Sequence, residues 1–290
     1  MLCALPVPWG TQLRCAAPFA RLSDDVALES CNESSLKELS SFFVDSFWVA
    51  STTFGDVPLS SSERSSLAKE MAKDFTQRYG NSWEAPGRTV GAGGRLFKSR
   101  LLLARGPDAA IIGCVGVEAA LVDPLSKTVV TAAQAEALVC VELANMDDAE
   151  GLSCREVYDT GGIAALASTL FPEYQPLGML TNLAIAPSQR RSGIGRELCE
   201  CCEQGAAQWK LPGMLLQVEE ANVGALGLYT QMGYEEIYRS SESLALRLRP
   251  GASTLASKLL IVESEALLEE VPSTVLTLAK QIQMSCVEPH

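Results

Sequence analysis

The stretch RRSGIGR, from Arg190 to Arg196, is where residue types and spacing point most clearly to chemistry. Before it, LTNLAIAP has the apolar content of a strand and ends at Pro187; after it, RELCECCEQGAAQW repeats apolar residues at helical spacing. Gly193 and Gly195 therefore stand at a helix N-terminus, where backbone N–H groups lack intrahelical acceptors and the helix dipole favours an anion. Three arginines surround that position: Arg190, Arg191 and Arg196. A pyrophosphate would fill such a site.

These glycines do not form a dinucleotide-binding fingerprint, because the third glycine position of G-x-G-x-x-G holds Leu198. On their own they are equally compatible with a tight turn that uses glycine for steric reasons. A second pattern favours the binding loop. About 30 residues downstream, GMLLQVEE predicts a strand, and N-x-x-A-x-x-L-Y-x-x-x-G-Y follows from Asn222 to Tyr234.

Together the two motifs resemble those of the GNAT superfamily of N-acetyltransferases. Arg190 to Gly195 matches its R/Q-x-x-G-x-G/A acetyl-CoA loop, and Asn222 to Tyr234 matches its second motif. The resemblance is sharpest over Gly178 to Tyr238, and LTNLAIAPSQRRSGIGREL looks most like plastid enzymes of plants and algae. It implies an α/β fold of the α+β type, with a mixed, mostly antiparallel sheet flanked by helices. The strands at Leu180 to Ala186 and Met214 to Glu219 would splay apart at its centre.

The resemblance also implies acetyl-CoA as co-substrate, held mainly by backbone groups. The pantetheine arm would bind along the first splayed strand, an N–H of which would polarise the thioester carbonyl. Tyr229 is the expected catalytic residue: its phenol, of ordinary pKa about 10, would donate a proton to a departing thiolate of pKa about 8.5. Asn222 would orient the cofactor or cap its helix. The residues expected to bind the cofactor are Leu183, Ala184, Ile185, Arg190, Arg191, Ser192, Gly193, Ile194, Gly195, Arg196 and Asn222.

The acceptor amine must be neutral to attack the thioester. A lysine of pKa about 10.4 lies roughly 3 units above neutral pH, which costs about 4 kcal/mol, whereas an α-amine at about 7.7 to 8.0 costs roughly 1 kcal/mol. The chain's one histidine is His290, so an internal imidazole base, a hydrolase triad and the usual zinc site are excluded, and no metal is expected. Carboxylates remain as candidate bases, each with a solvated or structural alternative: Glu118, Glu219 and Glu220.

The leading function is transfer of acetyl from acetyl-CoA to protein N-terminal α-amines, lysine side chains, or both. A non-catalytic acyl-CoA-binding or assembly module is the alternative from another class, and a small-molecule amine acetyltransferase differs only in its acceptor. Presence of both Gly193-Ile194-Gly195 and Tyr229 favours the enzyme, because a pure binding module has no need of the phenol.

The composition argues against nucleic acid as a partner, against a membrane span and against a metal site. With 35 acidic and 23 basic side chains the net charge is −12, which repels nucleic acid. The longest apolar run, AAIIGCVGVEAALV, is interrupted by Glu118 and is too short to span a membrane. Ten cysteines show no paired CxxC spacing, which favours a reducing compartment, and CECC reads as buried thiols on a helix rather than a metal site.

Residues 1–23 contain no acidic side chain, carry Arg14 and Arg21, and are rich in alanine and proline. This composition predicts an organellar transit peptide, with an acid-poor disordered start as the alternative. The plastid is preferred over the mitochondrion only through the resemblance.

Residues 24–250 are expected to form one acetyltransferase domain. VALES predicts a strand, ESSLKELSSFFVDSFW and SSERSSLAKEMAKDFTQRYG predict helices, and RLFKSRLLLAR with AAIIGCVGVEAALV predicts a β-hairpin. Residues 123–175 are an insert, consistent with one or more helices, and SLALRLRP looks like the closing strand. GAGGR, which lacks the ending of a P-loop, is expected to be a connector, and residues 251–290 a helical tail.

Overall fold

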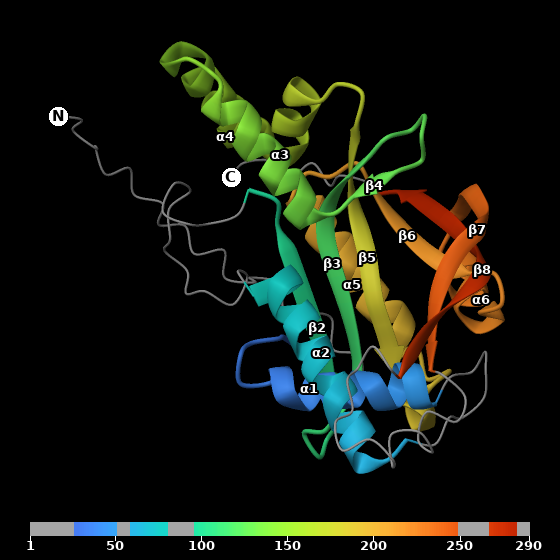
Figure 1. Ribbon diagram of the computed structural model, residues 1–290. Coiled ribbons are helices and arrows are strands. Elements are labelled where there is room, and N and C mark those ends of the chain that lie inside the picture. Colours follow the sequence, from blue (N-terminus) through green and yellow to red (C-terminus); the bar gives the residue numbers. More distant parts are fainter. Residues whose placement is uncertain (1–25, 51–58, 81–95, 249–266, 283–290) are drawn as a thin grey trace.

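The computed structural model describes residues 26–50, 59–80, 96–248 and 267–282 (Figure 1). Within them, a single large sheet has helices on both faces, and no helix has the length and apolar content needed to cross a membrane. The strands are β1 (Ala27–Ser30), β2 (Ser99–Arg105), β3 (Ile111–Val122), β4 (Val129–Val130), β5 (Gln175–Ile185), β6 (Gly213–Glu219), β7 (Glu235–Leu248) and β8 (Leu268–Gln281). The helices are α1 (Leu36–Phe43), the π-helical turn η1 (Val44–Val49), α2 (Ser61–Tyr79), α3 (Ala132–Ala144), α4 (Asp148–Leu170), α5 (Ile194–Gln208) and α6 (Val223–Gln231).

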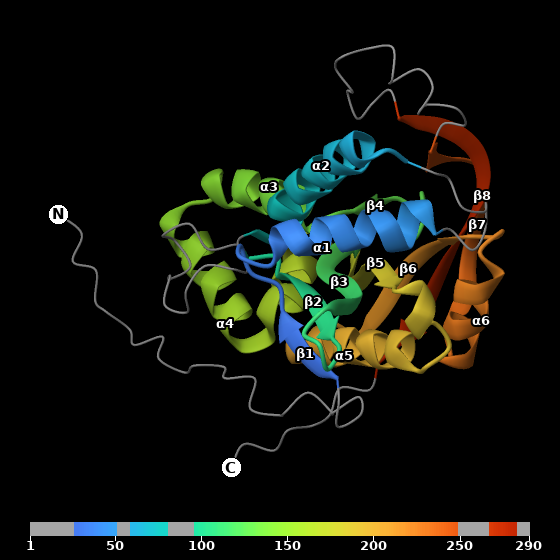
Figure 2. The same ribbon diagram turned by 90° about the horizontal axis from the view of Figure 1, so that it is seen from below.

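The sheet runs in the order β1-β2-β3-β5-β6-β8-β7, with β4 paired to β3. All pairs are antiparallel except β5 with β6. Helices α1 and α2 cover one face and α5 covers the other (Figure 2). The expected mixed, mostly antiparallel sheet flanked by helices is therefore confirmed, as are the first strand, the two N-terminal helices and the β2–β3 hairpin.

The central strands β5 and β6 pair over a short distance only. Their register runs from Gly178 opposite Met214 to Leu180 opposite Leu216, and β6 then continues to Glu219 without β5 beside it. The predicted splay is thus present. Near the same point β5 is irregular against β3, because Cys114 pairs with Ala184 whereas Gly116 pairs with Thr181.

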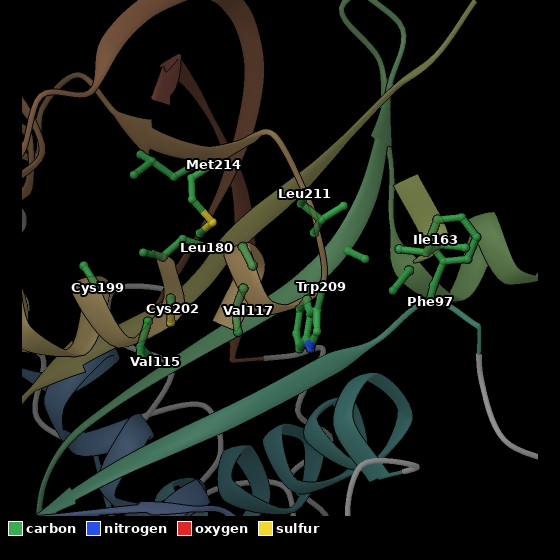
Figure 3. Packing of buried hydrophobic residues seen from close by; sticks show 14 of the residues in the cluster. Phe97, Val115, Val117, Ile163, Leu180, Cys199, Cys202, Trp209, Leu211 and Met214 are labelled. Carbon is green, nitrogen blue, oxygen red and sulfur yellow. The ribbon is translucent and has the colours of Figure 1, made fainter. Parts of the chain in front are cut away.

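The main core lies between the sheet and α5, with α4 adding to it. Trp209, Leu211 and Met214 pack near the end of α5, and Cys199 and Cys202 point from that helix onto the strands (Figure 3). Burial raises the pKa of both thiols above the ordinary value, which keeps them protonated and unreactive. All three cysteines of CECC are buried in this core, as expected for thiols on a packed helix.

Helix α2 shows how local sequence sets an element that later matters for the site. Ser60 and Glu63 form a capping box at its start. Four apolar or aromatic residues then follow at four-residue steps and face the sheet: Leu67, Met71, Phe75 and Tyr79. The helix ends with Tyr79 fully buried against β3 and β5.

The insert between β3 and β5 contains two helices, α3 and α4, as its composition suggested. Each begins with a capping box, Thr131 with Gln134 and Asp147 with Glu150. Helix α4 packs against β5 and bends at Gly162, whose φ of 71° lies in the left-handed region. The insert therefore braces the end of β5 that lies away from the splay (Figure 1).

The expectation of a helical tail over residues 251–290 is wrong for residues 268–281, which form β8. Strand β8 lies between β6 and β7, so SLALRL, the described part of SLALRLRP, belongs to the edge strand and is not the closing strand of the sheet. The physical reason is that β6 needs a hydrogen-bonding partner on its second edge, and VLTLAK supplies one whose Leu276 and Leu278 enter the core. Residues 251–266 and 283–290, the predicted transit peptide and GAGGR lie outside the described residues.

This correction leads to a stability prediction. Leu278→Ala should lower the free energy of unfolding by about 2 to 4 kcal/mol, because it removes a buried side chain and leaves a cavity beside β6. Leu244→Ala is the matched control, since Leu244 is 59% exposed on the edge strand, and it should change stability by about 0.5 kcal/mol or less. Urea unfolding of the two variants measures the difference; equal effects would contradict the placement of β8.

Candidate active site

The splay of β5 and β6 opens a cavity of about 730 Å³ on the sheet. Three kinds of wall surround it: the loop before α5, the start of α6, and a side formed by η1 and the end of β7. The expected cofactor-binding residues that line it are Leu183, Ala184, Ile185, Arg190, Arg191, Gly193, Gly195, Arg196 and Asn222. The structure thus brings residues from both sequence motifs to one cavity.

The glycine loop forms the N-terminus of α5. Gly193 has a φ of 99°, a left-handed conformation that side chains rarely adopt, and a Cβ there would meet nothing nearer than Glu197 at 3.9 Å. Glycine is therefore required by the backbone and not by close packing. The amides of Ile194 and Gly195 begin the helix, where no intrahelical acceptor exists for them. The loop can offer these N–H groups to an anion.

Two expected residues support this loop without lining the cavity. The Ser192 hydroxyl donates to the Gln189 carbonyl at 2.6 Å and so closes the preceding turn. The Ile194 side chain is buried in the core beneath α5. Any contact that Ile194 makes with a ligand must therefore come through its backbone.

Arg190 is placed differently from the expectation that its guanidinium meets the anion. Its Nη2 donates to the carbonyls of Ser46 at 2.8 Å and Ala50 at 2.9 Å, and its Nε donates to Ile185 at 3.3 Å. The guanidinium thereby ties η1 to the end of β5, because these C-terminal carbonyls of η1 need donors. Arg191 and Arg196 remain on the cavity wall beside Gly193.

Asn222 caps α6. Its side-chain oxygen accepts a hydrogen bond from the Ala225 amide at 3.2 Å, so the helix-cap alternative is confirmed. Because Asn222 also lines the cavity, a role in orienting the cofactor stays a prediction.

Tyr229 lies on α6 but faces the core. It is 5% exposed, lies outside the cavity wall, and its ring centroid is 5.9 Å from that of Tyr234. Burial, with smaller contributions from Cys199 and Cys202, raises the pKa of the phenol well above its ordinary value. Tyr229 is therefore protonated at neutral pH, as a proton donor must be, and its catalytic role stays a prediction.

The three candidate bases differ in where their carboxylates lie relative to the cavity. Glu118 is buried away from the cavity, where Ala132 N donates to it at 3.3 Å and Arg78 lies 3.6 Å from it. Glu220 is exposed and forms an ion pair with Arg239. Glu219 is the member of this set that lines the cavity.

Glu219 is already engaged by its surroundings. Arg247 donates to both of its oxygens, one of them at 2.9 Å, and Ser273 donates its hydroxyl at 2.7 Å. These three hydrogen bonds occupy most of the roughly four acceptor positions of the carboxylate, which leaves Glu219 little capacity to accept a proton from an amine even though it lies in the right place.

The wall opposite the glycine loop was not predicted. It contains Phe47 and Trp48 from η1 and Leu246, Arg247 and Leu248 from β7. Leu248 and Trp48 also share a small apolar cluster with α2, which holds the two elements together. No local motif marks these residues, because they come from segments about 200 residues apart that meet only in the fold.

Comparison with known proteins supports a family assignment. Residues 127–234 match the family model described as acetyltransferase (GNAT) family. The search of curated proteins finds no match for this chain.

Solved structures with a similar course include the ribosomal-protein-S18-alanine N-acetyltransferase from Escherichia coli, at 11% identity over 91% of this chain and 99% of that chain, with a TM-score of 0.44. Arabidopsis thaliana NAA60 in complex with acetyl-CoA is 13% identical over 89% and 98% of the two chains, with a TM-score of 0.42. The segment that matches the GNAT acetyltransferase family model covers 108 of the 290 residues and encloses both the loop at the start of α5 and the motif from Asn222 to Tyr234.

Proposed function

We propose that the protein acetylates primary amines of proteins, with N-terminal α-amines preferred over lysine side chains. The neutral amine attacks the thioester carbon directly, the thioester C–S bond breaks, and the coenzyme A thiolate takes up a proton. The acetyl group ends on the acceptor nitrogen, which loses a proton to solvent or to a base.

The observation that carries this preference is the engagement of Glu219. It is the candidate carboxylate on the cavity wall, and Arg247 and Ser273 both donate to it. A carboxylate whose oxygens already accept these hydrogen bonds gives little help in removing a proton from an amine. Neutralising a lysine at pH 7 costs about 4 kcal/mol, whereas an α-amine costs about 1 kcal/mol and needs little assistance.

The shape of the cavity supports a peptide acceptor. The glycine loop lies on one wall, whereas Phe47, Trp48, Leu246 and Leu248 form an apolar wall on the other. Phe47 and Leu246 are 45% and 48% exposed, so apolar surface remains accessible there to an incoming chain. A small polyamine would make little use of such a wall.

The acceptor prediction is tested with labelled acetyl-CoA and matched peptides. A peptide with a free N-terminus and no lysine should be acetylated at least 10-fold faster at pH 7 than the same peptide with a blocked N-terminus and one lysine. Mass spectrometry locates the acetyl group. Preference for the lysine peptide or for polyamines would contradict the proposal, and binding of acetyl-CoA without transfer to any amine would favour the non-catalytic module.

The cofactor loop gives a second prediction. Gly193→Val should lower acetyl-CoA affinity by at least 10-fold, because valine disfavours the left-handed conformation that opens the first turn of α5. Calorimetric titration of the folded variant measures the loss. Gly227→Val, in the second motif on α6, is the control, since a Cβ there meets nothing within 4 Å and its φ is ordinary. Equal affinity in wild type and Gly193→Val would remove the pyrophosphate from this loop.

Tyr229 gives a third prediction. Tyr229→Phe keeps the ring packing and should reduce kcat by about 10²-fold to 10⁴-fold with little change in acetyl-CoA affinity, if the phenol protonates the leaving thiolate. The deficit should shrink above about pH 8.5, where a thiolate leaves without a proton, while the raised pKa of Tyr229 keeps the wild type protonated.

The matched control is Tyr234→Phe, which removes the neighbouring buried hydroxyl and keeps the same aromatic pair. It should retain most of the wild-type kcat. A kcat profile of Tyr229→Phe that equals the wild type at all pH values would assign the proton to another donor.

A further inference from the structure

We propose that the buried phenol of Tyr79, at the end of α2, is a positioning residue that holds the irregular part of β5 in the shape needed to polarise the thioester carbonyl. This inference rests on acetyl transfer taking place in the cavity described above. Tyr79 does not touch the ligand; it acts through Thr181 and Asn182.

The feature that Tyr79 holds is a bulge. Because Cys114 pairs with Ala184 and Gly116 with Thr181, the single residue between them on β3 faces two residues of β5, Asn182 and Leu183. Asn182 has a φ of 54°, a left-handed conformation that is uncommon for residues with a side chain. Such a conformation persists where the surroundings hold it in place.

The bulge is what presents β5 to the cavity. It begins two residues after Leu180, the last residue of β5 that pairs with β6. Leu183, its second residue, is the first residue of β5 on the cavity wall. The direction of the backbone N–H groups that meet a thioester in this cavity therefore depends on the conformation of Asn182.

Tyr79 contacts the residue before the bulge, Thr181, and the first residue of the bulge, Asn182. The side-chain Nδ2 of Asn182 donates to the phenol oxygen at 3.0 Å, and the phenol and the Thr181 hydroxyl lie 2.6 Å apart and share a hydrogen bond. A phenol can accept one hydrogen bond and donate another, so both contacts can form together. Burial raises the pKa of Tyr79, so the hydroxyl stays protonated across the working range of pH.

The chain also leaves space for this hydroxyl. Gly116 lies opposite Thr181, and a Cβ at Gly116 would lie only 2.7 Å from the Thr181 hydroxyl and would overlap the phenol oxygen of Tyr79. The ring itself sits among apolar residues of α2, β2 and β3, where a phenylalanine would pack equally well. The hydroxyl is therefore explained by its polar contacts, which include Arg78 as well as the two hydrogen bonds to β5, and not by packing.

Loss of the hydroxyl should affect the reaction more than the binding of acetyl-CoA. The pyrophosphate and most of the pantetheine arm would contact the α5 loop and the rest of β5, which Tyr79 does not hold. The carbonyl needs a donor aimed at the position where negative charge develops, and small misplacements of such a donor slow reactions strongly.

The test is Tyr79→Phe in the full chain. We expect kcat to fall by about 10-fold to 100-fold with KM for acetyl-CoA within about 2-fold of wild type. The infrared carbonyl stretch of bound, isotope-labelled acetyl-CoA should move from its lowered wild-type frequency back toward that of free acetyl-CoA. A residue that only stabilises the fold would leave this frequency unchanged. Tyr174→Phe, on a partly buried tyrosine before the far end of β5, is the matched control and should behave as wild type.

Thr181 supplies a second pair of variants if Tyr79→Phe folds poorly. Thr181→Val removes the partner of the phenol and should reproduce the loss, whereas Thr181→Ser keeps a hydroxyl and should restore most of the wild-type kcat and carbonyl frequency. Wild-type values of both in Tyr79→Phe, or in Thr181→Val, would overturn the proposal. Because the infrared measurement needs only bound acetyl-CoA, a wild type that transfers acetyl to no amine would refute the proposed function and still leave the carbonyl shift to decide the role of Tyr79.

Discussion

The parting of β5 from β6 after Leu180 is the constraint on which the rest of the structure depends. Backbone N–H and C=O groups need hydrogen-bond partners, and a sheet interrupted at its centre leaves some of them facing a cavity. The fold answers this need in several ways. Arg190 donates to the Ile185 carbonyl, and β8 pairs with the second edge of β6. The groups of β5 that face the cavity are then the natural place for the amide-rich arm of a cofactor.

A gap of this kind must be kept open from both sides. On one side α2 ends in Tyr79, which contacts β5 at the bulge, and on the other side the long β7–β8 pair extends past the end of β6. The two sides meet where Leu248 packs with Trp48. The cavity is thus framed by elements from distant parts of the chain, which makes its shape a property of the whole sheet.

The charged groups of the cavity would serve different steps of the proposed acetyl transfer. The start of α5 and its arginines offer positive charge to an anion, whereas Glu219 is neutralised by Arg247. Tyr229 keeps its proton because it is buried. The candidate carboxylate on the cavity wall thus already accepts hydrogen bonds from Arg247 and Ser273, while the phenol of Tyr229 lies outside that wall. The proposed α-amine acceptor suits such a site, because its pKa of about 7.7 to 8.0 lies only about 1 unit above neutral pH.

Local sequence was enough to predict those features that depend on neighbouring residues. Some features act within one or two turns of backbone, so their patterns are visible in the sequence. They are the glycines at 193 and 195, the cap at Asn222 and the four-residue steps of apolar residues in α2. The same holds for the strand, two-helix and hairpin order that begins the domain, and for the helices of the insert.

Tertiary structure alone decided which of these residues meet. The fold turns Arg190 toward η1, buries Tyr229, and brings Glu219, alone of the three candidate carboxylates, to the cavity wall. It also places β8 inside the sheet, where the composition suggested a helix. It also joined Tyr79 to Asn182 across about 100 residues. These outcomes depend on which edge of the sheet still needs a partner and on how much space each side chain finds there. Such quantities are set by contacts distant in sequence, and a local pattern therefore cannot contain them.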